Sequence, residues 1–191
     1  MQVADRILVA GASGMLGSAL VRALRAQGHE RVLAPRRSTL DLRDPRATRT
    51  WFGDVRPDYV FLAAARVGGI AANLRDPVAF LGDNLRIQVN ALEGAWAAGC
   101  RKVLVVGSSC MYPREAPQPM RENSLLTGPL EPTNEGYALA KLSGVRLAQA
   151  YAAQHGLRVA CPVPCNLYGT GDHFEPERSH VLSAMVRRFV D

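Results

Sequence analysis

Tyr137 and Lys141 are of types, and at a spacing, that could carry out proton transfer. They stand four residues apart, so on a helix both side chains would lie on the same face. The ammonium group of Lys141 would then favour the ionised phenol and lower the pKa of Tyr137, which would let the tyrosine act as an acid or base near neutral pH. Only two of the 23 basic residues are lysines, so a lysine at this position is informative. For the pair taken alone, the alternative is a helix with one buried aromatic residue and one solvated cation.

A glycine-rich segment near the start of the chain has the context of a dinucleotide-binding loop. Residues 6–10 form a short apolar run that predicts a buried strand, and apolar positions recur at helical spacing from residue 19. Between them, Gly11 permits a tight turn, Gly14 lets the backbone approach a pyrophosphate, and Gly17 allows the helix to pack closely on the strand. The amide groups of the helix N-terminus would bind the phosphates. The cofactor contacts expected in this loop are Gly11, Ser13, Gly14, Met15 and Gly17.

Two arginines follow residues 31–34, the predicted second strand. At this point many dinucleotide-binding folds place an acidic residue that binds the ribose hydroxyl groups of NAD. Arg36 and Arg37 stand here instead, and their guanidinium groups match the 2′-phosphate of NADP. The sequence therefore favours NADP(H) over NAD(H). The alternative is a pair of solvated arginines in a loop.

The composition is that of one α/β enzyme domain. The chain has 191 residues, of which 48% are hydrophobic, so one core and about one domain are expected. No apolar run approaches the roughly 18 residues of a membrane span, and nothing at the start reads as a signal peptide. The four cysteines have no metal-ligand spacing, so we expect no metal site and a reduced, cytoplasmic setting.

The net charge of +6 raises the question of nucleic-acid binding. The arginines are scattered, with no long basic block and little aromatic interleaving, so we expect neither a nucleic acid nor a membrane as a partner. An anionic cofactor and an anionic substrate account for the excess of positive charge equally well.

Short apolar runs alternate with segments of helical periodicity along the chain. This alternation predicts a parallel, doubly wound sheet, the Rossmann type of α/β fold. Ligands of such sheets bind beyond the carboxyl ends of the strands, so Ala63–Ala65 and Gly107–Cys110 should line the site. Asp76 and Pro77 form a good helix start, as N-cap and first residue. The expected strands span residues 6–10, 31–34, 58–63, 102–107 and 158–163, and the expected helices span 14–27, 45–53, 77–98, 136–155 and 180–190.

Ser108 stands at the end of the predicted fourth strand, where its hydroxyl group could bind the same substrate oxygen that Tyr137 protonates. If the extended backbone continues, the side chains of Ser108 and Cys110 point to one side and that of Ser109 to the other. Serines in a Gly-Ser-Ser segment are more often plain turn residues. Ser108 becomes a candidate because of Tyr137 and Lys141.

These residues resemble the extended short-chain dehydrogenase/reductase family, and within it the epimerase/reductases that act on GDP-4-keto-6-deoxy-D-mannose. The glycine loop and the Tyr-x-x-x-Lys spacing identify only the superfamily, whereas five longer segments point to this branch. The resemblance covers essentially the whole chain. It implies an NADPH-dependent oxidoreductase with 3,5-epimerase activity, a homodimer that produces GDP-L-fucose. The segments are Ala63–Ile70, Gly107–Pro113, Leu130–Ala138, Asn166–Gly169 and Ser179–Val181.

The resemblance also implies a role for each site residue. Its catalytic triad falls on Ser108, Tyr137 and Lys141, and its acid/base pair for epimerisation falls on Cys110 and His180. Protons next to a ketone are acidic because the carbanion is delocalised as an enolate, and a base on one face with an acid on the other inverts the carbon. Taken alone, Cys110 would be read as a small buried residue and His180 as a polar residue at a helix start. By the same resemblance Ala63, Ala65 and Lys141 contact the cofactor, and Asn166 and Arg188 contact the GDP-sugar substrate.

Members of the family dimerise through two helices, which correspond here to residues 77–98 and 136–155. A homodimer is therefore expected. Apolar positions on these helices would serve either the interface or the core; they include Ile87, Leu92, Val145 and Leu147.

The chain departs from the family pattern in several places. Gly136 stands where relatives often have proline, Cys165 where threonine is common, and Ser13 where some carry an arginine. Family members continue well beyond the last residue of this chain. Residues 1–191 are thus expected to form an NADP-binding Rossmann domain, with 165–191 as the beginning of the substrate-binding region and the rest of that lobe largely absent. Two alternatives stay open: a nucleotide-sugar 4-epimerase or dehydratase that retains NAD, and a non-catalytic NADP-binding module.

Overall fold

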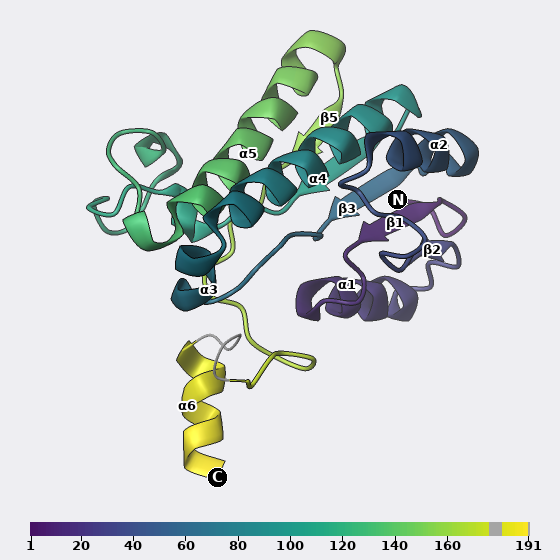
Figure 1. The fold of residues 1–191 in the computed structure, drawn as a ribbon. Helices are drawn as coiled ribbons and strands as arrows, with labels where there is room; N and C mark the ends of the chain where they lie inside the picture. Colours follow the sequence, from purple (N-terminus) through teal and green to yellow (C-terminus); the bar gives the residue numbers. More distant parts are fainter. Residues whose placement is uncertain (176–180, 191) are drawn as a thin grey trace.

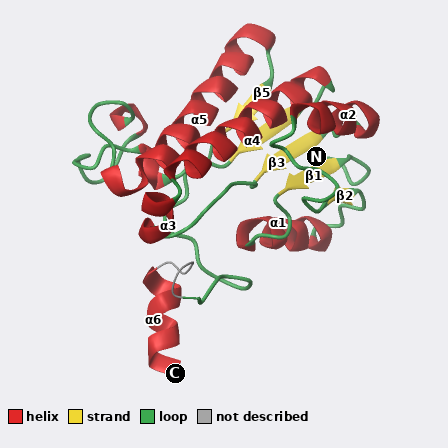
Figure 2. Ribbon diagram, viewed as in Figure 1, coloured by secondary structure: helices red, strands yellow, loops and turns green. Residues whose placement is uncertain are grey.

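Five parallel strands form the centre of the computed structural model, which describes residues 1–175 and 181–190 (Figures 1 and 2). The strand order is β2-β1-β3-β4-β5, so β1 lies between β2 and β3. Ile7 of β1 pairs with Val32 on one side and with Tyr59 on the other. The chain therefore leaves β1 and β3 at a topological switch point, where parallel sheets bind ligands. The strands are β1 (Ile7–Ala10), β2 (Val32–Leu33), β3 (Tyr59–Leu62), β4 (Lys102–Val105) and β5 (Arg158–Ala160).

The helices alternate with these strands, as the sequence predicts. They are α1 (Met15–Ala26), α2 (Pro45–Val55), α3 (Ile70–Arg75), α4 (Pro77–Ala97), α5 (Glu135–His155) and α6 (Val181–Val190). Three short 3₁₀ helices lie in the connections: η1 (Ser109–Met111), η2 (Glu122–Ser124) and η3 (Pro132–Asn134). The parallel, doubly wound α/β fold expected from the sequence is confirmed.

The pleat of β1 divides its residues between two hydrophobic clusters. Leu8 and Ala10 belong to a cluster with residues of α2, α4 and α5, whereas Ile7 and Val9 pack with α1. All four side chains are almost completely buried. The molecule therefore has three layers, with α1 on one face of the sheet and α2, α4 and α5 on the other (Figure 1). Successive side chains of a strand point to opposite faces, which is why one short apolar run serves both clusters.

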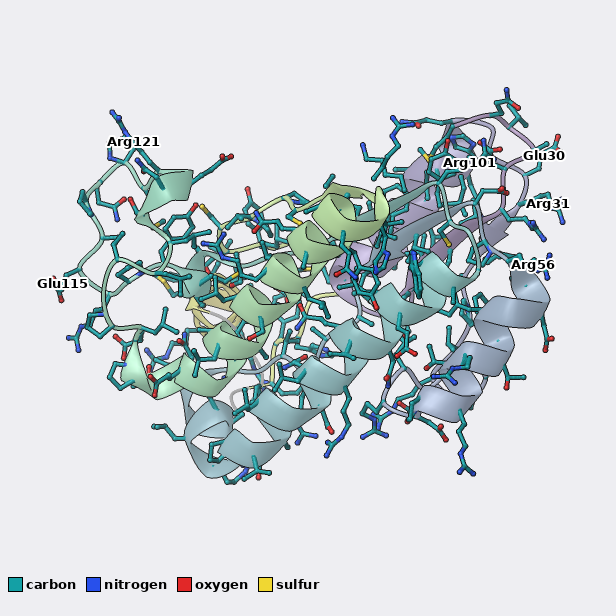
Figure 3. The ribbon with its side chains drawn as sticks, turned by 90° about the horizontal axis from the view of Figure 1, so that it is seen from above. Glu30, Arg31, Arg56, Arg101, Glu115 and Arg121 are labelled. Carbon is teal, nitrogen blue, oxygen red and sulfur yellow. The ribbon has the colours of Figure 1, made fainter. Side chains whose placement is uncertain are left out.

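α4 and α5 lie side by side across their face of the sheet and make extensive contact (Figure 3). Ile87, Leu92 and Val145 are buried in the core, and Leu147 packs against it. These four side chains therefore pack in the core and are not exposed on an outer face of the molecule. Figure 3 also shows that the loop with Glu115 and Arg121 extends at the opposite end of the molecule from Arg31, Arg56 and Arg101.

The region between β3 and α4 differs from the sequence prediction. α3 was not expected, because its six residues are too few to show a helical period. Pro77 is the first residue of α4 and Asp76 precedes it, as predicted, but the Asp76 side chain makes no capping hydrogen bond. Its carboxylate pairs instead with Arg66 at 3.8 Å and Arg75 at 3.3 Å. Ion pairing has replaced capping at this helix start.

The segment that follows β5 leads to α6, which lies apart from the layers in Figure 1. Ser183 is buried and donates a hydrogen bond to Asp172, whereas Phe189 and Val190 are more than three-quarters exposed. Within residues 1–175 and 181–190, no helix combines the length and the apolar character needed to cross a membrane. Each of the four cysteines is a free thiol.

Candidate active site

A cavity of about 970 Å³ opens at the carboxyl ends of β1, β3 and β4. It is where the topology places ligands, and residues from distant parts of the chain meet there. Of the predicted cofactor contacts, Arg36 is absent from the lining and the others are present: Gly11, Ser13, Gly14, Met15, Gly17, Arg37, Ala63, Ala65 and Lys141. Of the predicted catalytic residues, the lining also includes Ser108, Cys110 and Tyr137. The candidate cofactor and catalytic groups therefore share one space.

The glycine loop between β1 and α1 is shaped by two positions at which no side chain fits. Gly11 has a φ of +84°, and a Cβ there would lie 2.6 Å from the backbone nitrogen of Ala64. A Cβ on Gly17 would lie 2.0 Å from the carbonyl oxygen of Gly11. A Cβ on Gly14 would meet nothing closer than 3.4 Å, so packing alone does not require glycine at this point of the cavity wall. The first turn of α1 has no side-chain cap, which leaves its amide groups for an anion. This loop fits the pyrophosphate of a dinucleotide.

Lys141 is held beneath the cavity by burial and by one hydrogen bond. Its side chain is 4% exposed, and Nζ donates to the carbonyl oxygen of Val106 at 2.8 Å. Nζ lies 5.9 Å from the centre of the Tyr137 ring, so the predicted common face of the helix is confirmed. Burial lowers the pKa of Lys141 to about 8, because removing an ammonium group from water disfavours its charged form. The amine is still mostly protonated at neutral pH.

The expected lowering of the pKa of Tyr137 is wrong. Burial of the phenol raises its pKa to about 12, the charge of a nearby Cys110 thiolate acts in the same direction, and a hydrogen bond with Ser108 opposes both. The ammonium group of Lys141 is directed to Val106 rather than to the phenol oxygen. Desolvation therefore dominates over the neighbouring cation. A phenol with a raised pKa is protonated at neutral pH, which suits a proton donor.

The backbone is extended at Ser108 and turns after it, so the condition that the extended geometry continues to Cys110 is not met. Ser108 is the residue before the 3₁₀ helix η1, and its hydroxyl oxygen accepts a hydrogen bond from the backbone nitrogen of Cys110 at 3.3 Å. The turn keeps Ser108 and Cys110 on the cavity wall and adds Ser109 to it. The hydroxyl and the thiol both reach the space in front of Tyr137, by a turn rather than by strand alternation.

Asn134 and Asn84 contribute to the site, and sequence reasoning missed both. Asn134 lines the cavity and donates a hydrogen bond from Nδ2 to the sulfur of Cys110 at 3.3 Å. Asn84, in α4, accepts from the Arg66 backbone nitrogen at 2.7 Å and donates to the Arg66 carbonyl oxygen at 3.0 Å. This pair of bonds fixes the loop after β3 on the cavity wall. Asn84 lies within a helix, and Asn134 stands next to a helix start, where asparagine is common, so neither residue carried a signal of its own.

An ion-pair network borders the end of the cavity near β2. Arg37 lies 3.4 Å from Asp41, and Asp83 of α4 lies 3.5 Å from Arg43 and 3.4 Å from Arg66. Arg43 holds the pKa of Asp41 well below its usual range through a side-chain hydrogen bond. The members that line the cavity are Arg37, Asp41, Arg43, Arg66 and Asp83. Arg36 is exposed outside it.

The substrate residues expected from the family pattern are only partly assembled. Asn166 lines the cavity and is exposed, and Ala184 of α6 lines it as well. Arg188 is exposed on α6 and is not part of the lining. His180 and Ser179 lie outside the described residues.

This arrangement defines a class: Rossmann-type folds with a glycine loop at the switch point of the sheet and a Ser/Tyr/Lys set beside it. The chain belongs to the NAD dependent epimerase/dehydratase family, whose pattern matches residues 7–191.

The chain is also similar to individual proteins with curated names or solved structures. The chain is 49% identical over 189 residues to a putative GDP-L-fucose synthase 2 from Arabidopsis thaliana. The aligned region covers 99% of this chain and 58% of the relative. It matches a GDP-D-glycero-L-gluco-heptose synthase from Campylobacter jejuni, crystallised in the presence of NADPH, with a TM-score of 0.95 and 35% identity over 99% of this chain and 55% of that one. A GDP-L-fucose synthetase from Naegleria fowleri bound to NADP matches with a TM-score of 0.87 and 30% identity over 98% of this chain and 62% of that one. The chain thus spans little more than half the length of these relatives.

Proposed function

We propose that the chain is the cofactor-binding part of an NADPH-dependent epimerase/reductase that converts GDP-4-keto-6-deoxy-D-mannose to GDP-L-fucose. The observation that supports this function best is the single cavity that contains the glycine loop, the Ser108/Tyr137/Lys141 set and Cys110. The 49% identity to a putative GDP-L-fucose synthase agrees with it. We assign residues 1–191 to the NADP-binding domain, with 165–191 as the beginning of the substrate-binding region.

Epimerisation would begin at Cys110. Its thiolate removes a proton from a carbon next to the ketone, at C3 or C5, and the electron pair of the broken C–H bond passes to the carbonyl oxygen as an enolate. His180 is the proposed acid that returns a proton from the opposite face. Repetition at the second carbon gives the L-configured sugar.

Reduction at C4 would use Tyr137 as the proton donor. Its raised pKa keeps the phenol protonated at neutral pH, and the hydroxyl of Ser108 binds the same carbonyl oxygen. When bound, NADPH supplies the hydride that reduces this carbonyl group. The positive charge of Lys141, fixed by Val106, favours the negative charge that develops on the oxygen.

Binding of NADP(H) is proposed to rest on the glycine loop, the N-terminus of α1, Ala63, Ala65 and Lys141. Arg37 would bind the 2′-phosphate, because its guanidinium group borders the cavity at the end of β2. Arg36 is exposed and is not part of the lining, so it is proposed to contribute less. Two similar structures were obtained with NADPH or NADP, which supports the same choice here.

The GDP-sugar would bind on the side of the cavity formed by residues 164–167 and α6. Asn166 is the proposed contact in the lining. Arg188 would contact the substrate after α6 has moved or after further chain has been added, because it now points to solvent.

A homodimer is proposed to form through the outer faces of α4 and α5. The residues expected in its interface are exposed and apolar rather than buried: Val78, Val89, Trp96 and Leu139. The four free thiols support a reducing compartment such as the cytoplasm. Sedimentation of the chain as a monomer at micromolar concentration would contradict the dimer.

The experiment that tests the function follows two signals in D₂O, with GDP-4-keto-6-deoxy-D-mannose and NADPH as reactants. A chimaera in which a relative's C-terminal part follows residue 190 should incorporate deuterium at C3 and C5 and oxidise NADPH. The 191-residue chain should bind NADPH in calorimetry but turn over at a small fraction of the chimaera's rate, because many substrate contacts are lacking. Neither deuterium incorporation nor NADPH oxidation in the chimaera would refute the proposal.

Similarity at 35% identity to two Campylobacter jejuni reductases, a GDP-6-OMe-4-keto-L-xylo-heptose reductase and a GDP-mannoheptose C4 reductase, favours one second candidate, a reductase of another GDP-linked 4-keto sugar. It predicts NADPH oxidation without deuterium incorporation at C3 and C5.

A further inference from the structure

Asn134 occupies a helix-capping position but does not cap its helix. It precedes α5 with φ −139° and ψ 20°, and its side chain makes no capping hydrogen bond. Asparagine is favoured at this position because its side-chain oxygen normally accepts a hydrogen bond from an amide in the first turn. At the start of α5 that stabilising contact is forgone. Some other interaction must hold the side chain.

The amide group of Asn134 is turned toward Cys110 instead. Nδ2 donates to the sulfur at 3.3 Å, and both residues line the cavity. Oδ1 is buried, and no hydrogen-bond partner for it exists among the described residues. A buried oxygen without a partner costs free energy, so this orientation gives up stability on two counts. Such local losses are typical of functional positions.

We propose that Asn134 is a positioning residue for Cys110, whose side-chain amide hydrogen-bonds the sulfur and stabilises the thiolate that acts as base in epimerisation. The inference rests on the proposed function and adds a residue to its machinery. A hydrogen bond to a charged acceptor is stronger than one to a neutral acceptor, so the N–H···S contact favours S⁻ over S–H. In the step that follows, a C–H bond of the sugar breaks, an S–H bond forms, and the electron pair moves to the carbonyl oxygen.

The side chain can follow this proton transfer. Rotation of the amide by 180° presents Oδ1 to the sulfur, and Oδ1 accepts a hydrogen bond from the S–H that has formed. Asparagine can therefore stabilise the thiolate before the transfer and the thiol after it. Aspartate, with two acceptor oxygens and a negative charge, would oppose the thiolate, and serine would cap α5 without reaching the sulfur.

Other charged groups also act on Cys110, and the test must separate them from Asn134. Tyr137 faces it from α5, Lys141 lines the same cavity, and α5 lies against η1. Substitutions at residue 134 leave all of these in place. The remaining titratable and charged groups of the cavity lining are Arg37, Asp41, Arg43, Arg66, Asp83, Cys165 and His173.

The pH dependence of alkylation tests the proposal on the 191-residue chain without substrate. The parent, Asn134→Ser and Asn134→Asp are treated with iodoacetamide from pH 5 to 10, and modification of the Cys110 peptide is followed by mass spectrometry. Asn134→Ser should shift the midpoint for Cys110 upward by about one pH unit, a tenfold decrease in reactive thiolate below the midpoint. Asn134→Asp should shift it further. Cys165, which is exposed in the same cavity, is the internal control and should keep its midpoint.

Thermal unfolding shows whether the variants fold. Both serine and aspartate can cap α5, so each should unfold at or above the temperature of the parent. An unchanged or lowered midpoint for Cys110 in Asn134→Ser would overturn the proposal. Equal shifts of Cys110 and Cys165 would also overturn it, because they would indicate a general change in structure. Absence of deuterium incorporation by the parent chimaera would refute the proposed function and leave the alkylation result to decide the role of Asn134.

Discussion

α5 and α6 both border the candidate site, and they differ in how they are held. α5 packs on α4, on η1 and on the sheet, and its residues Ala140, Lys141 and Leu142 are buried. α6 contributes Ala184 to the cavity wall, but Phe189 and Val190 are exposed to solvent. The two cavity groups whose pKa values are shifted chiefly by burial, Tyr137 and Lys141, lie on the helix that is packed on several sides. Groups whose chemistry depends on desolvation thus lie on α5, because the elements packed around this helix exclude water.

Among the tests of the difference between α5 and α6, the largest effect is expected from removing the proton donor of α5. In the chimaera, Tyr137→Phe should reduce NADPH oxidation by about 10²–10⁴-fold, because one general acid is lost, while deuterium still enters the sugar at C3 and C5. Cys110→Ser should suppress the incorporation and starve the reduction of its substrate, with NADPH affinity unchanged. The two variants are followed by absorbance and by mass spectrometry of the sugar. Deuterium incorporation at the parental rate in Cys110→Ser would contradict the role of Cys110.

Lys141→Met tests how burial on α5 affects the free energy of unfolding. A lysine whose pKa falls from 10.5 to about 8 on folding destabilises the folded state fully below pH 8, and this penalty is relieved as the pH rises toward 10.5. Removing it should gain roughly 3 kcal/mol below pH 8, offset by about 1 kcal/mol for the Val106 oxygen left without its donor. Denaturant unfolding should therefore show a net gain of about 2 kcal/mol at pH 7 that shrinks toward pH 10, together with lost activity.

Lys102→Met removes the only other lysine and serves as the matched control for charge. It should not show the same dependence on pH. A destabilised Lys141→Met variant at pH 7 would mean that burial of this ammonium group is not a cost to the fold.

Arg37 and Arg36 offer a comparison within one loop, since Arg37 lines the cavity and its neighbour does not. Arg37→Ala should remove most of the preference for NADPH over NADH, with a loss of about tenfold in NADPH affinity from one charge-assisted hydrogen bond. Arg36→Ala should change it by less than half as much in free energy. Titration calorimetry with both cofactors measures the effect. Equal affinity of the parent for NADPH and NADH would contradict the choice of cofactor.

The smallest effect is expected on α6. Phe189→Ala should change the free energy of unfolding by less than about 0.5 kcal/mol, because the side chain is 85% exposed. Leu142→Ala, on the buried side of α5, should cost about 2–5 kcal/mol. Denaturant unfolding compares the two. A loss above 1 kcal/mol from Phe189→Ala would show that α6 is packed more tightly in solution than its exposure indicates.

Features that depend on neighbours in the chain could be predicted from the amino-acid sequence. The strand, glycine loop and helix around Gly11–Gly17 follow from apolar periodicity and glycine spacing, and the common face of Tyr137 and Lys141 follows from their separation. The alternation of strands and helices was sufficient to predict the parallel sheet. The sheet in turn predicts a site at the carboxyl ends of its strands, here β1, β3 and β4. Segment boundaries and the short helix α3 were less predictable, because a few residues show no period.

Other properties depend on which distant groups are packed together, and these follow only from the three-dimensional fold. The pKa of Tyr137 is raised rather than lowered because burial outweighs the charge of Lys141, whose Nζ is bound to a carbonyl group 35 residues away. Cys110 meets Asn134 across 24 residues because η1 turns the chain toward the start of α5. Arg37 faces the cavity and Arg36 does not, although they are adjacent in sequence. Residue types and spacing indicate which groups are available for chemistry, whereas desolvation and hydrogen-bond direction are set only when the layers of the fold close around them.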